Sequence, residues 1–166
     1  MTKEHCFSNR LSTPELLRSV ACSNCTRAAK LEQIRNLLDQ DDGCLLWSVV
    51  KLYDQQSEDE KQTAKLLYKD RRGFGKVDFS VFMVIGRAAT EKGYLRDEQK
   101  ATCRARNDKG RTRIGKYAAQ LLALILAEAC PEKLTPRLAR LVPPLRKPAG
   151  REGFPLTDVA DQEASA

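Results

Sequence analysis

The stretch that decides the fold is residues 117–129, which read YAAQLLALILAEA. Its central run is apolar apart from Gln120 and is about half as long as a membrane-spanning helix. Pro131 follows closely, and proline ends a helix because it lacks a backbone N–H and clashes with the preceding turn. We therefore expect a buried helix over residues 111–129, near the centre of the domain.

The segments before this stretch carry helix-start residues and amphipathic spacing. Thr13 followed by Pro14 supplies an N-cap and then a proline at the first helical position. A second helix is expected from about Thr26, because apolar residues recur three and four positions apart, and the acidic turn at residues 41–43 ends it. Apolar spacing also predicts a helix over residues 45–53.

Two later segments also predict helices, one from its capping residues and one from its apolar residues. Ser57 and Glu60 have the spacing of a capping box, in which each side chain bonds a backbone N–H at the helix start. Residues 77–85 alternate in part like a strand, yet Phe82 and its neighbours are apolar on both faces. No partner strand is evident in the sequence, so we favour a buried helix capped by Asp78 over the alternative of a strand.

Length and composition complete the expected fold. The chain has 166 residues, of which 42% are hydrophobic and 31% charged, so it is long enough for one domain with a real core. We expect an all-α, compact bundle of five to seven helices over residues 13–142. Residues 1–12 are expected to form a flexible leader. Residues 143–166 mix Pro, Gly, Ala, Ser and scattered charges, which predicts a disordered C-terminal tail.

The formal net charge of +7 is unevenly distributed. Residues 1–60 hold 7 basic and 10 acidic side chains, which gives −3, and residues 121–166 hold 6 of each, which gives 0. Residues 61–120 hold 16 basic and 6 acidic side chains, which gives +10. Such a field attracts nucleic acid, acidic protein surfaces or anionic lipid, although a solvated face kept for solubility has the same composition.

The densest positive charge, here called the basic stretch, lies at residues 100–116. Its seven cations stand against one acid, Asp108, and they are Lys100, Arg104, Arg106, Lys109, Arg111, Arg113 and Lys116. We expect a polar helix over residues 95–106, a turn, and then the apolar helix, which is the outline of a helix-turn-helix unit. Because the second helix has few polar side chains, phosphate contact is expected rather than deep reading of bases.

These patterns predict a non-enzymatic intracellular protein, a small regulator or accessory factor, that binds nucleic acid through the seven cations. DNA is favoured over RNA as the partner, and no membrane partner is expected. The alternative is an adaptor or inhibitor whose basic face docks an acidic partner protein. The acidic first third also allows self-association through charge pairing between copies.

The six cysteines are Cys6, Cys22, Cys25, Cys44, Cys103 and Cys130. Residues 1–10 lack the apolar core of a secretory signal, so we expect reduced thiols in the cytoplasm rather than three disulfides. The CxxC spacing of Cys22 and Cys25 is half of a zinc or redox motif. A structural zinc site needs four ligands, and the other candidates are scattered, so we expect no metal and no cofactor. A zinc site that includes Cys22 and Cys25 remains the alternative.

Other chemistries lack the residues they need. A calcium loop that begins at Asp70 would have no oxygen ligand at three key positions. Gly73 and Gly75 lack the rest of a phosphate-binding motif. His5 is the only histidine and lies in the expected leader, and no close carboxylate pair stands in an apolar setting. No catalytic residue is therefore predicted.

Overall fold

The computed structural model describes residues 13–66 and 72–142. Within these ranges the chain forms eight α-helices, two short 3-10 helices and no strand, which confirms the all-α class but exceeds the expected five to seven helices. The α-helices are α1 (Thr13–Cys22), α2 (Arg27–Gln40), α3 (Asp42–Asp54), α4 (Glu58–Thr63), α5 (Phe79–Lys92), α6 (Asp97–Arg104), α7 (Ala118–Ala129) and α8 (Pro136–Ala139). The 3-10 helices are η1 (Gly115–Tyr117) and η2 (Pro131–Lys133). The expected leader and the expected disordered tail lie outside the described residues.

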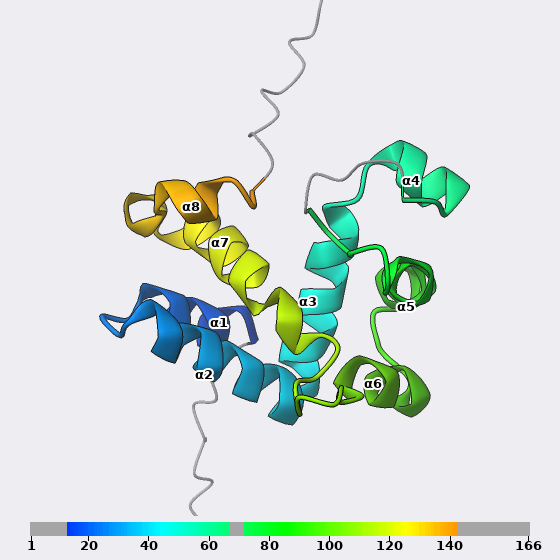
Figure 1. Cartoon of the computed structure of the whole chain (residues 1–166), viewed down its shortest axis with the longest axis horizontal. Coiled ribbons are helices and arrows are strands. Elements are labelled where there is room, and N and C mark those ends of the chain that lie inside the picture. The colour runs from blue at the N-terminus through cyan, green and yellow to red at the C-terminus, as the bar shows by residue number, and fades with distance from the viewer. Residues whose placement is uncertain (1–12, 67–71, 143–166) are drawn as a thin grey trace, which may run out of the picture.

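Helix α3 runs through the middle of the molecule (Figure 1). On one side it packs against α1 and α2, which lie side by side, and against α7; on the other side it packs against α5. Helix α8 packs on α7. None of the helices in the described ranges is both long and apolar enough to cross a membrane.

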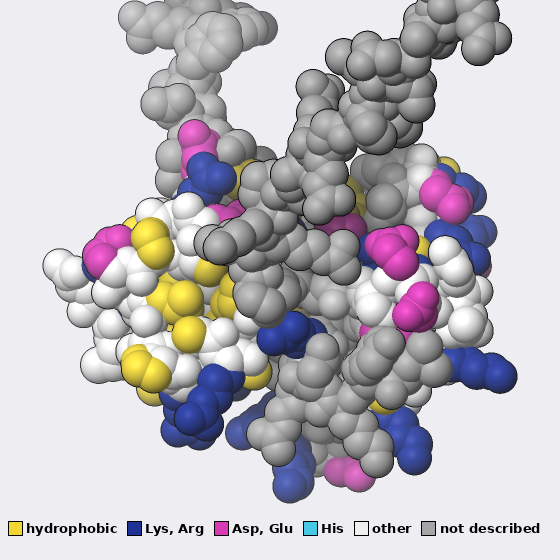
Figure 2. Space-filling view, turned by 90° about the horizontal axis from the view of Figure 1, so that it is seen from above, with side chains coloured by type: hydrophobic (Ala, Val, Ile, Leu, Met, Phe, Trp, Pro, Cys, Tyr) yellow, Lys and Arg dark blue, Asp and Glu magenta, His cyan; other side chains and the backbone are white. Residues whose placement is uncertain are grey.

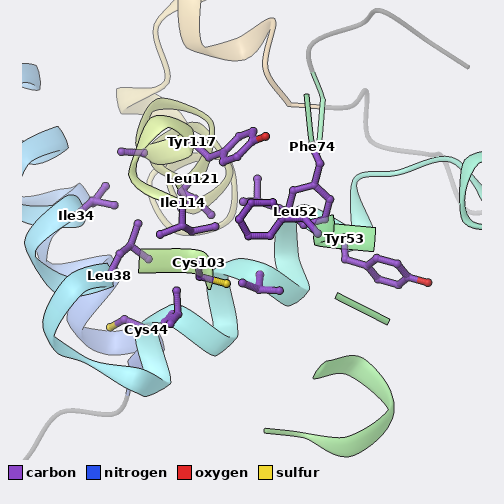
Figure 3. Close-up of a cluster of buried hydrophobic side chains, with 14 of the residues drawn as sticks. Ile34, Leu38, Cys44, Leu52, Tyr53, Phe74, Cys103, Ile114, Tyr117 and Leu121 are labelled. Atoms are coloured by element: carbon purple, nitrogen blue, oxygen red, sulfur yellow. The ribbon is translucent and has the colours of Figure 1, made fainter. Parts of the chain in front are cut away.

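The core forms where α2, α3 and α7 meet (Figure 3). Ile34 and Leu38 from α2, Leu52 from α3 and Leu121 from α7 converge there and are fully buried. Burying one such side chain stabilises the fold by about 1.5–3 kcal/mol. Almost every face of α7 is buried, so its expected place near the centre of the domain is confirmed.

Local capping explains several helix starts. Thr26 caps α2, and Ser57 and Glu60 form the expected capping box, with both hydrogen bonds at 3.2 Å. Asp41 does more than end α2: its side chain accepts the backbone N–H of Cys44 at 2.6 Å and so starts α3 at once. The chain therefore turns from α2 into α3 without a loop.

The ambiguous segment at residues 77–85 leads into a helix, α5, as favoured from the sequence. Phe79 and Phe82 are buried three residues apart, whereas Val84 is 69% exposed, so burial follows a helical and not an alternating pattern. Asp78 occupies the N-cap position, but its side chain makes no capping bond. The expected capping role of Asp78 is wrong, because its carboxylate binds other groups described below.

The predicted helix over residues 111–129 begins later than expected. α7 starts at Ala118, and only the single turn of η1 precedes it. The backbone N–H of Arg113 donates to the carbonyl of Ala105 at 2.9 Å. This bond pairs the chain before η1 with the end of α6, so it is not available to a helix. α6 is also shorter than the predicted range of residues 95–106.

Gly86 marks the close packing of α5 on α3. A Cβ atom at this position would lie 2.8 Å from the Cβ and Cδ2 atoms of buried Tyr53. We expect Gly86→Ala to lower the free energy of unfolding by about 1–3 kcal/mol, because the two helices must move apart. Denaturant titration of the two proteins measures this difference.

Gly75→Ala is the matched control, because the nearest atom to its Cβ would be the Tyr117 hydroxyl oxygen, at 3.7 Å. We expect this control to change stability by less than about 0.5 kcal/mol. Alanine is also a better helix former than glycine. A Gly86→Ala protein as stable as the parent would therefore contradict the close approach of α3 and α5.

Candidate nucleic-acid interface

The basic stretch does not form a helix-turn-helix unit. Lys100 and Arg104 lie on α6, Lys116 lies in η1, and the other four cations lie in the connection formed by residues 105–114. These four are Arg106, Lys109, Arg111 and Arg113. α7, which would be the recognition helix, is enclosed in the core and is not free to enter a DNA groove.

The connection contains an ordered turn that presents Lys109 and Arg111. The Oδ1 atom of Asn107 accepts the backbone N–H groups of both residues, each at 3.0 Å. The N–H of Asn107 in turn donates to the carbonyl of Arg111 at 2.9 Å. Gly110 has a φ of +71°, a left-handed conformation that glycine adopts without strain. The two cations are therefore carried by a hydrogen-bonded turn rather than by a loose arm.

Lys100 and Arg104 are paired with Asp42, the first residue of α3. Lys100 Nζ lies 2.8 Å from Asp42 Oδ2, and Arg104 Nη1 lies 2.8 Å from Asp42 Oδ1. The hydrogen bond from Lys100 lowers the pKa of Asp42, and the hydrogen bond to Asp42 raises the pKa of Lys100. Because the Asp42 side chain is 53% exposed, solvent screens both pairs.

Arg106 forms an ion pair with Asp39 in the last turn of α2. Its Nη2 atom lies 3.0 Å from Asp39 Oδ2, and its Nη1 atom donates to the carbonyl of Gly110 at 2.8 Å. Close by, Arg104 Nε donates to the carbonyl of Leu38 at 3.1 Å. Part of the basic stretch therefore has a structural task, which is to hold the connection against α2.

Arg113 and Lys116 meet at the buried carboxylate of Asp78, whose side chain is only 2% exposed. Asp78 Oδ1 lies 3.0 Å from Arg113 Nε, and Asp78 Oδ2 contacts Lys116 Nζ. The Tyr117 hydroxyl donates to Asp78 Oδ2 at 3.1 Å and accepts the N–H of Gly75 at 2.9 Å. Burial raises the pKa of Tyr117, so its hydroxyl stays protonated and keeps donating.

Lys109 and Arg111 are the members of the basic stretch that form no ion pair with any described residue. Both side chains are exposed. In Figure 2 lysine and arginine side chains gather along one edge of the surface, with acidic side chains among them. The free positive charge of the stretch is thus concentrated at the turn.

The acidic partners of the basic stretch were missed in the sequence because they are distant along the chain. Asp39 and Asp42 lie in the first third, whose negative balance was their only signal. From the sequence, this negative charge allows ion pairs between copies of the protein. In the structure, Asp39 and Asp42 form ion pairs with cations of the same chain.

A cavity of about 600 Å³ lies beside η1. Its lining combines aromatic and cationic side chains, among them Phe74, Tyr117, Arg72, Lys76 and Lys116. A pocket of this size can hold a small ligand or a side chain of a partner.

The cysteines differ from the expectation of reduced thiols. Cys22, at the end of α1, forms a disulfide with Cys130, which directly follows α7, with the two Cα atoms 6.3 Å apart. The pair forms because α1 packs along α7. Cys22 therefore does not join Cys25 as a thiolate ligand of zinc. In the part of the chain that the structure describes, no group of three His, Cys, Asp or Glu side chains is placed to hold a metal ion.

Comparisons with protein-family models, with curated proteins and with solved structures find no match to this chain. Among the charges, contacts and cavities of the described residues, the ordered basic turn is the feature that most favours a function.

Proposed function

We propose that the protein binds nucleic acid through electrostatic contacts to phosphates and catalyses no reaction on it. The observation that best supports this is the pair of Lys109 and Arg111, which are exposed, held on an ordered turn and without an ion pair to any described residue. Contacts from Lys and Arg to phosphates dominate affinity for nucleic acid and carry no sequence information. Such binding suits a small accessory factor or regulator.

The paired cations would contribute unequally. Arg106 is 62% exposed, and its pair with Asp39 is of the surface kind that stabilises a protein little, so a phosphate can compete for it. Arg113 and Lys116 face a buried carboxylate and are expected to stay there. The Cys22–Cys130 disulfide does not favour the cytoplasmic location expected from the sequence, because disulfides are rare in the reducing cytosol.

Reversing both turn charges should weaken binding strongly. We expect Lys109→Glu/Arg111→Glu to reduce affinity for a short DNA duplex about tenfold or more at low salt, since two phosphate contacts become repulsive. The plot of log affinity against log salt should also become less steep by about two, because each phosphate contact to duplex DNA contributes about 0.9 to the magnitude of the slope. Fluorescence polarisation with labelled DNA, and with RNA of the same length, measures both quantities.

Arg137→Glu/Arg140→Glu, in α8 and directly after it, is the matched control, because it makes the same change in net charge on another exposed surface. If this control weakens binding as much as the turn variant does, long-range attraction and not the turn is responsible. If the unaltered protein binds neither DNA nor RNA at low salt, the proposed function is wrong.

A second candidate function is docking to an acidic partner protein. The cavity beside η1 favours it, because the aromatic side chains of Phe74 and Tyr117 lie there next to exposed Lys76. That combination fits an apolar side chain that carries a carboxylate beside it. The same basic surface would then steer the partner and not nucleic acid.

The two functions are separated by nuclease treatment and by filling the cavity. For a protein partner, retention from a nuclease-treated lysate should persist and should be lost in Ala119→Trp, because Ala119 lines the cavity. For nucleic acid, retention should disappear after nuclease treatment and DNA binding should survive Ala119→Trp.

A further inference from the structure

Three cysteines lie close together in the fold at the ends of α1 and α7. Cys22 and Cys130 form the disulfide, and Cys25 follows Cys22 by three residues as a free, exposed thiol. Neither the ion pairs of the basic stretch nor its turn involves these residues. The CxxC spacing in the sequence therefore marks a free thiol beside an existing disulfide.

Cys25 is the accessible free thiol of the described residues. The other two free cysteines in these ranges, Cys44 and Cys103, have no exposed surface. Burial raises the pKa of each to about 12, so neither forms the thiolate that attacks a disulfide near neutral pH. Among the cysteines in residues 13–66 and 72–142, thiol–disulfide chemistry on the folded protein thus involves Cys25 and the Cys22–Cys130 bond.

The connection between α1 and α2 keeps Cys25 near Cys22. The backbone N–H and the hydroxyl of Ser23 both donate to the carbonyl of Val20, so the chain bends directly after Cys22. α1 and α2 then lie side by side, which requires the chain to reverse over this short connection (Figure 1). A disulfide spans Cα separations of about 4.4–6.8 Å, a distance that residues three apart reach where the chain bends as sharply as in a four-residue turn.

Two lysine side chains bind the backbone at the end of α1, where the disulfide begins. Lys30 Nζ donates to the carbonyl of Ala21 at 2.6 Å, and Lys133 Nζ donates to the carbonyl of Cys22 at 2.5 Å. Both bonds hold carbonyls of the last two residues of α1, next to the disulfide.

We propose that these three cysteines form a thiol–disulfide exchange site whose substrate is the protein's own disulfide. The Sγ thiolate of Cys25 attacks Sγ of Cys22, and a Cys22–Cys25 bond forms as the Cys22–Cys130 bond breaks. The bonding electron pair leaves on Sγ of Cys130, which takes up the proton that Cys25 released. One disulfide and one thiol are present before and after, so no external oxidant or reductant is needed.

The exchange changes what the disulfide connects. Before it, the bond ties the end of α1 to the end of α7. After it, the bond closes a short ring within the α1–α2 connection, and Cys130 carries a free thiol. The site therefore has two covalent states that differ in whether α1 and α7 are linked.

Peptide mapping distinguishes these states. Trypsin releases residues 19–27, which contain Cys22 and Cys25, and residues 117–133, which contain Cys130. After incubation of the full chain at mildly alkaline pH, acid quenching and alkylation, we expect two products. One is the two peptides joined by a disulfide, and the other is residues 19–27 with an internal disulfide beside alkylated residues 117–133.

Variants test each step of the exchange. Cys25→Ser should yield the joined peptides alone, and Cys130→Ser should form the Cys22–Cys25 disulfide in a glutathione redox buffer. Finding only joined peptides in the unaltered protein after hours of incubation would overturn the proposal, as would a Cys130→Ser protein that leaves Cys22 and Cys25 reduced. Fragment spectra that place Cys25 in a bond to Cys130 would overturn the assignment of Cys22 as the attacked sulfur.

Discussion

Replacing Asp78 with alanine should lower the free energy of unfolding by about 3 kcal/mol. The side chain is 2% exposed and joins Arg113, Lys116 and the Tyr117 hydroxyl at one point. Removing it leaves two cations facing each other and a buried hydroxyl without its acceptor. The expected loss lies at the lower end of the range for a broken buried pair, because both cations are partly exposed and can turn to water.

Urea unfolding followed by circular dichroism measures this loss. Asp108→Ala is the matched control, since it removes the same side chain and charge from an exposed position in the turn. We expect that control to change stability by less than about 0.5 kcal/mol. If the two substitutions lowered stability equally, the effect of Asp78→Ala would come from the lost negative charge alone, and the contacts around Asp78 would not stabilise the fold.

Removing the Cys22–Cys130 disulfide should have a comparable or larger effect. The bond joins residues 108 positions apart, and closing a loop of that length restricts the unfolded chain strongly. We expect Cys22→Ser/Cys130→Ser to lower the free energy of unfolding by about 3–5 kcal/mol. Both proteins in this comparison carry Cys25→Ser, so that the disulfide of the reference protein cannot move from Cys130 to Cys25.

The exposed position of Cys25 makes its own replacement the control for this measurement. Cys25→Ser alone should leave the unfolding free energy within about 0.5 kcal/mol of the parent protein. Reduction with dithiothreitol should reproduce the effect of the double substitution in the same background. If the double variant were as stable as its background, the bond would not constrain the unfolded chain in the way inferred from loop length.

The helices were predictable because their signals are local. The Ser57–Glu60 capping box acts within one helical turn, and the apolar run after Tyr117 must be buried whatever it packs against. The helix that contains Phe82 was harder to predict, because apolar residues on all of its faces obscure the helical periodicity of the sequence. The absence of a possible partner strand in the sequence decided that case correctly.

The charge and cysteine pairings were not predictable because they join distant parts of the chain. Asp78 looked like a helix cap, since its three partners lie beyond residue 110. In the sequence Asp42 belongs to an acidic turn, and its ion pair with Arg104 of α6 becomes visible only in the folded chain. Cys22 had a close candidate partner in Cys25, and only the packing of α1 along α7 brings Cys130 nearer to its sulfur.

The disulfide also determines what a protease can separate. It encloses most of the helical domain in one covalent ring, from Cys22 to Cys130. A single backbone cut within that ring, for example in the turn around Gly110, yields two fragments that remain joined as one molecule. Such a nicked chain would run as a single species on a non-reducing gel, and it would separate into two only after reduction or after the bond had moved to Cys25.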